Sequence, residues 1–156
     1  MRPLGLEMLA AGAFRRTQAE RDDQHLSWAR SDRAFFAAGA CHILAWSIRE
    51  MYAERELAIG SIRRVGAEQV FHTYATWDRW TFDHSGWHRF PAIVEANEAY
   101  DGGPLESVRI EDDLTAFCAR HHHRMPEQYW ANPSSRARGY ITQFSMPWDG
   151  HDGSRS

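Results

Sequence analysis

The chain contains no lysine, and all 18 of its basic residues are arginine. Chemistry that needs a lysine amine, such as a Schiff base or a lysine general base, is therefore excluded. Two explanations for the absence stay open. A GC-rich genome replaces lysine with arginine, and selection against lysine-targeted modification has the same effect in a protein delivered into a foreign cytosol.

Cysteine is also scarce, and long apolar runs are missing. Cys41 and Cys118 are far apart and fit no CxxC pattern. Because nothing resembles a signal peptide, we expect reduced thiols in a cytoplasmic protein. No apolar run reaches transmembrane length, so we expect no membrane partner. The formal net charge of −3 argues against a nucleic-acid partner, which needs a basic face. The doublets Arg15–Arg16 and Arg63–Arg64 are interpreted as solvated surface.

The chain does contain enough apolar residues for one core. A length of 156 residues with 43% hydrophobic residues predicts a single domain. We assign this domain to residues 1–148 and expect residues 149–156 to form a disordered tail. Helical spacing in the N-terminal third gives way to period-two alternation over 57–86, and helical patterns return near the C-terminus. This order predicts an α+β fold with N-terminal helices, a small antiparallel sheet and C-terminal helices.

Turn and capping residues divide the chain into individual elements. Gly39 interrupts the helix expected over 31–52, so either the helix tolerates this glycine or the main helix begins near Ala40. A hairpin turn is expected at Trp77–Asp78. The expected helices cover about 6–14, 18–30, 31–52, 111–125 and 126–131, with a loop and a short helix within 88–103, and the expected strands cover 57–65, 68–76, 79–86 and 105–110.

Three residues suited to thiol catalysis follow one another along the chain: Cys41 at an expected helix start, His72 on a strand and Asp83 on the next strand. A two-residue turn at Trp77–Asp78 would place His72 directly opposite Asp83. A helix N-terminus and an adjacent imidazolium both favour the thiolate, and a carboxylate orients the imidazole. The pattern therefore predicts a nucleophile, a general acid–base and an orienting residue.

The stabilisation of an oxyanion is only partly accounted for by the sequence. The backbone N–H of Cys41 is the expected donor, because it lies in the first turn of the helix. No second donor can be assigned, and Gln24 is the nearest upstream side-chain amide.

The motifs around these three residues resemble a known superfamily. Gly39-Ala40-Cys41, Phe71-His72-Thr73-Tyr74 and Phe82-Asp83-His84-Ser85-Gly86 resemble the papain-like cysteine hydrolases in the broad sense. They are most similar to the transglutaminase-like and arylamine N-acetyltransferase-like branch, which uses Cys, His and Asp in this order. The resemblance covers about residues 31–88 and implies the same three roles. The chain departs from the family pattern in its short Cys-to-His segment and in lacking the usual Trp or Gly-Gly neighbours of the nucleophile.

These observations predict a thiol-dependent hydrolase or acyl transferase that needs no cofactor. Its substrate would be a peptide, a protein or a small acyl compound with an amide, ester or thioester bond. Peptidase, amidase, deamidase and acyltransferase activities all stay open, because each begins with the same acyl-enzyme. The alternative is a non-enzymatic interaction or accessory domain in which Cys41 is a packing residue. The sequence does not predict the oligomeric state.

Further aromatic and imidazole side chains are candidates for binding substrate. Trp77, Trp80 and Trp87 are expected either to wall a substrate cleft or to occupy the core and its edge. His42 follows the nucleophile but points to a different helix face, so we interpret it as pocket-lining or structural.

One run of residues has ligand types that suit a metal. Cys118 and His122 are four residues apart on one expected helix. No second pair of ligands completes a tetrahedral site, and histidines near a helix C-terminus are favourable for dipole reasons alone. We therefore expect no bound metal.

Overall fold

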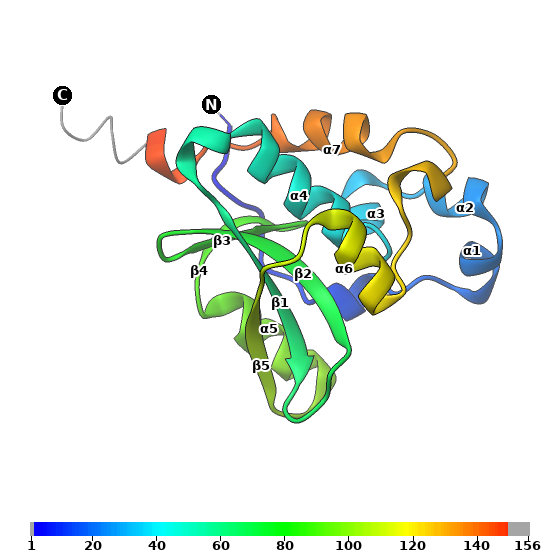
Figure 1. Cartoon of the computed structure of the whole chain (residues 1–156), viewed down its shortest axis with the longest axis horizontal. Helices are drawn as coiled ribbons and strands as arrows, with labels where there is room; N and C mark the ends of the chain where they lie inside the picture. Colours follow the sequence, from blue (N-terminus) through cyan, green and yellow to red (C-terminus); the bar gives the residue numbers. More distant parts are fainter. Residues whose placement is uncertain (1, 150–156) are drawn as a thin grey trace.

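The computed structural model describes residues 2–149, which fold around a central five-stranded antiparallel sheet (Figure 1). The strand order is β4-β3-β2-β1-β5. The strands are β1 (Ala58–Arg64), β2 (Val70–Trp77), β3 (Trp80–Asp83), β4 (Gly86–Arg89) and β5 (Leu105–Ile110). The predicted α+β class is confirmed. Most of the tail expected at 149–156 lies outside the described residues.

Helices precede, interrupt and follow the sheet. Helix α4 lies against the sheet, α7 packs against α4, and α5 lies on the other side of the sheet (Figure 1). The α-helices are α1 (Gln18–Asp22), α2 (Gln24–Trp28), α3 (Asp32–Ala37), α4 (Cys41–Met51), α5 (Ala92–Asp101), α6 (Leu114–His121) and α7 (Pro133–Ile141), and the 3-10 turns are η1 (Ala11–Phe14), η2 (Ala53–Arg55) and η3 (Pro126–Gln128). Within residues 2–149, none of these helices has the length and apolar character needed to cross a membrane.

Side-chain caps explain where the N-terminal helices begin. Thr17 forms the expected capping box with Glu20 at the start of α1. Asp23 accepts hydrogen bonds from the N–H groups of the next turn and starts α2, so the helix expected over 18–30 is divided in two. The Ser31 side chain accepts the Ala34 N–H and caps α3.

The structure decides between the two predictions for the start of the main helix. Gly39 has a φ of 108°, a conformation that favours glycine, and α4 begins at Cys41. A Cβ at Gly39 would also lie 3.2 Å from the guanidinium carbon of Arg16. The glycine therefore separates α3 from α4 and places Cys41 in the first turn of an 11-residue helix.

The core is built mainly on α4. Ile43, Leu44 and Ile48 are at most 1% exposed and pack with α7 and the sheet. The sequence did not predict α7, although Asn132 caps it and Pro133 occupies its first turn, a typical helix start. A smaller cluster of buried side chains includes Ile93 of α5.

The hairpin register differs from the predicted one by two residues. Trp77 pairs with Trp80, so the turn is Asp78–Arg79 rather than Trp77–Asp78. Asp78 adopts a φ of 53°, which aspartate tolerates better than most residues. The strand expected over 79–86 is also wrong, because a tight turn after Asp83 divides it into β3 and β4.

The N-terminal arm runs beside the β3–β4 turn. Leu6 N–H donates to Ser85 O at 2.8 Å, and Trp87 N–H donates to Leu4 O at 2.9 Å. The arm therefore shields this turn. The short helix expected over 6–14 is limited to the single turn η1.

Candidate active site

The His72 imidazole and the Asp83 carboxylate form a buried pair. His72 Nε2–H donates to Asp83 Oδ2 at 2.9 Å, and neither side chain is more than 2% exposed. In the observed register His72 and Asp83 are diagonal neighbours rather than direct partners. A shift of two residues keeps every side chain on its face of the sheet, so the predicted contact forms in spite of the register error.

Asp83 is held as a carboxylate by groups on several sides. Burial alone would raise its pKa, but the charge of His84 and the hydrogen bond from His72 lower it to about 2. Asp83 Oδ1 also accepts the Ser85 N–H at 2.8 Å. His84 places its Nδ1 3.4 Å from Asp83 Oδ2.

The His72 imidazole favours its protonated form. Burial lowers its pKa, but the hydrogen bond with Asp83 and the interaction with the Cys41 thiol outweigh burial and raise the pKa to about 10. Because Nε2 is bound to Asp83, Nδ1 is the ring nitrogen that can interact with the thiol. Within residues 2–149, Nδ1 has no hydrogen-bond partner.

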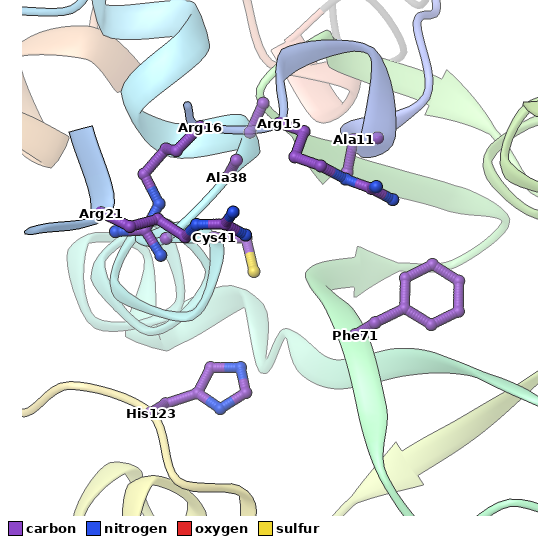
Figure 2. Close-up of a pocket in the computed structure, with 11 residues that line it drawn as sticks. Ala11, Arg15, Arg16, Arg21, Ala38, Cys41, Phe71 and His123 are labelled. Carbon is purple, nitrogen blue, oxygen red and sulfur yellow. The ribbon is translucent and has the colours of Figure 1, made fainter. Parts of the chain in front are cut away.

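Cys41 lies where its thiol can ionise and meet a ligand. Burial opposes ionisation, but hydrogen bonding with His42 and His72 lowers the pKa of the thiol well below its ordinary value. The N-terminus of α4 also favours the thiolate. Although Cys41 is only 6% exposed, it lines a cavity of about 260 Å³, and Figure 2 shows its sulfur pointing into this space.

Two backbone groups beside the thiol are candidate oxyanion donors. Leu44 N–H donates to Ala40 O at 3.2 Å, so the N–H groups of Cys41 and His42 precede the first helical hydrogen bond. No side chain caps this end of α4. Gln24 does not fill the role, because its amide oxygen, oriented toward Arg124, accepts from that guanidinium at 2.7 Å.

Residues that the sequence did not indicate line the rest of the cavity. Arg15, Arg16 and Arg21 form one side, and Phe71 and His123 form the other (Figure 2). The interpretation of Arg15–Arg16 as solvated surface is wrong for Arg16, which is half-buried. Since only long-range folding brings these segments to the nucleophile, no local pattern could have revealed the cavity.

The arginine doublet Arg63–Arg64 and the cavity-lining His123 each have defined partners. Arg63 and Arg64 pair with Glu106 and Asp101 at 2.6 Å and 2.9 Å. His123 Nδ1–H donates to His121 O at 2.9 Å, which leaves Nε2 as the second nitrogen of a cavity-lining imidazole. Burial lowers the pKa of His123 and favours its neutral form.

His42 is fully buried and does not line the cavity. Its Nε2–H donates to Arg124 O at 2.8 Å, and Cys118 donates to the same oxygen at 3.4 Å. Burial lowers the pKa of His42, but interactions with the thiols of Cys118 and Cys41 outweigh burial and raise it to about 9. His42 therefore stabilises the Cys41 thiolate from outside the cavity and does not contact a ligand.

The three candidate tryptophans lie elsewhere. Trp87 is 2% exposed and donates its indole N–H to Met146 Sδ at 3.3 Å. Trp77 packs against Trp148, and Trp80 lies beneath the guanidinium of Arg89. None of the three lines the cavity around Cys41 in the described part of the chain. They occupy the core and its edge instead.

Possible metal ligands gather around Asp83 rather than on α6. Cys118 is buried against His42, whereas His122 ends α6 in a left-handed conformation and is exposed. Within the described residues, ligand atoms of His72, Asp83 and His84 lie within 4.8 Å of one another. A metal ion there would have to replace the hydrogen bond between His72 and Asp83.

No protein-family model matches the chain, and comparison with curated proteins and with solved structures found no match. The resemblance to transglutaminase-like proteins therefore stays a prediction from the residues.

Proposed function

We propose that this protein is a cysteine-dependent hydrolase or acyl transferase of transglutaminase-like type. The observation that carries the proposal is a cavity-facing thiol at a helix N-terminus, together with a buried imidazole that lowers the pKa of this thiol and is held by a buried carboxylate. Cys41 is the nucleophile, His72 the general acid–base and Asp83 the residue that orients His72. A packing cysteine needs neither the cavity nor the ion pair.

The chemistry follows from the starting protonation states. The Cys41 thiolate attacks the carbonyl carbon of an amide, ester or thioester, and the oxyanion forms near the free N–H groups of α4. The bond to the leaving group then breaks, and the leaving group takes a proton from the His72 imidazolium. The product is an acyl-enzyme with a neutral His72.

A second acceptor completes the cycle. Neutral His72 removes a proton from water or an amine, which attacks the thioester and releases the acyl group. Cys41 leaves as a thiolate and His72 is again protonated. Water gives hydrolysis and an amine gives acyl transfer. Since the mechanism needs a reduced thiol, we also propose a cytoplasmic location.

Trapping the acyl-enzyme tests this proposal. Incubation with p-nitrophenyl acetate followed by intact-mass and peptide mass spectrometry is expected to locate one acetyl group on Cys41. Cys118→Ser should keep the adduct, and Cys41→Ala should lose it together with the rapid release of p-nitrophenol. The proposal would be contradicted if Cys41 were acetylated no faster than Cys118. It would also be contradicted if acetylation of the protein were unchanged in Cys41→Ala.

A further inference from the structure

The cavity around Cys41 carries a concentration of positive charge. Arg15, Arg16 and Arg21 line it, and Arg124 adds its charge near Arg16. Of the described residues that line this cavity, none is acidic. Three guanidinium groups beside a nucleophile are unexpected in a chain of net charge −3.

The charge on this wall is compensated only in part and without direct contact: the charge of Arg16 helps to lower the pKa of Glu20, and the charge of Arg15 helps to lower the pKa of Asp101. Arg16 is half-buried, and neither it nor Arg21 forms an ion pair with a carboxylate in the described part of the chain. Arg21 donates only to the neutral Gln18 side chain, at 3.2 Å. Burial and the nearby charge of Arg124 lower the pKa of Arg16.

We propose that the acyl substrate carries a carboxylate or phosphate group, which binds to Arg15, Arg16 and Arg21 while its carbonyl carbon meets Cys41. This inference rests on the proposed function and names the substrate class. Arginine binds both anions through paired N–H groups, so the shared chemistry covers both sources. The cavity of about 260 Å³ fits a small acyl compound, and Phe71 supplies an apolar wall opposite the arginines.

Two alkylating reagents of similar size test the charge preference directly. In a Cys118→Ser background, Cys41 displaces iodide from iodoacetate, which is anionic, or from iodoacetamide, which is neutral. Each reaction forms one S–C bond and releases iodide. Any change in thiolate content alters both rates equally, so the ratio of the two rates isolates the effect of the arginines. We expect the ratio for Cys41 to exceed that of 2-mercaptoethanol by about tenfold.

Charge-removing variants locate the effect. Arg16→Gln and Arg21→Gln should each lower the iodoacetate-to-iodoacetamide ratio by about threefold. Arg138→Gln, on exposed α7 surface away from the cavity lining, makes the same change in net charge and should leave the ratio unchanged. Because Arg16 packs on Gly39, the exposed Arg21 gives an independent test if Arg16→Gln disturbs the fold.

Four outcomes separate the possibilities. If inorganic phosphate but not acetate protects Cys41 from alkylation, the anionic group of the substrate is a phosphate. If acetate but not phosphate protects Cys41, it is a carboxylate. Fast alkylation by iodoacetamide with a ratio equal to that of 2-mercaptoethanol would overturn the anion site and leave the proposed function standing. Slow alkylation by both reagents would overturn the proposed function and this inference with it.

Discussion

At the scale of single residues, the site depends on opposing effects at buried ionisable groups. Burial alone would keep Cys41 and Asp83 neutral and would deprotonate His72. Their mutual contacts reverse all three tendencies. Cys41 and His72 shift in opposite directions, so between about pH 7 and pH 8.5 the folded and unfolded chains each hold one proton on this pair, which then contributes little net slope to stability.

Asp83 contributes to stability in a defined range of acid pH. Its folded pKa of about 2 lies below the ordinary 3.8, so its contribution is complete above about pH 4 and is lost as the pH falls to 2. Wild-type protein should lose about 2 kcal/mol more unfolding free energy over this range than Asp83→Asn does. Urea unfolding at several pH values measures the difference, and parallel acid profiles for the two proteins would contradict the assignment.

At the scale of elements, the β3–β4 turn holds Asp83 in place. Tyr140 of α7 donates its hydroxyl to His84 O at 2.6 Å, and Arg33 of α3 donates to Ser85 Oγ at 3.0 Å. The N-terminal arm covers the same turn through the pairing of Gly5 with Gly86. A helix that the sequence did not predict therefore supports the predicted carboxylate.

Gly86 is the position where this turn tolerates least change. Its φ is 79°, and a Cβ there would lie 2.7 Å from both Gly5 Cα and the Phe144 ring. Gly86→Ala should lower the free energy of unfolding by about 3 kcal/mol, from a strained backbone and a steric clash together. Thermal and urea unfolding measure the loss.

Gly102→Ala is the matched control. Its φ of 83° is similar, but a Cβ there meets nothing within 4 Å. It should therefore cost only about 1 kcal/mol. Equal losses in the two variants would show that the packing of the arm against the turn contributes nothing.

At the scale of the whole molecule, the parts of the fold that could be predicted are those that local patterns determine. Gly39 before an apolar run indicated a start near Ala40 as one of two alternatives for the main helix, and alternation with turn residues indicated the strands. The contact of His72 with Asp83 was predicted because it requires only a shared face of the sheet, which a shift of two residues preserves.

Long-range packing determines what the sequence could not show. The arm bearing Arg15 and Arg16 has no periodic pattern, and its position depends on hydrogen bonds to the distant β3–β4 turn. Helix α7 contains few apolar residues, so its packing against α4 gives little signal, although Asn132 and Pro133 are a helix start. The cavity around Cys41 and the positive charge that lines it therefore become apparent only in the three-dimensional structure.

The activated thiol is the central claim for the molecule, and its alkylation by iodoacetamide across pH 5–9 tests it most directly. In a Cys118→Ser background, the rate for Cys41 should already be near its maximum well below the ordinary thiol pKa of about 8.5. His72→Ala should move the profile to higher pH by at least about one unit. A wild-type profile centred near 8.5 and unchanged in His72→Ala would contradict the account and leave Cys41 as a packing residue.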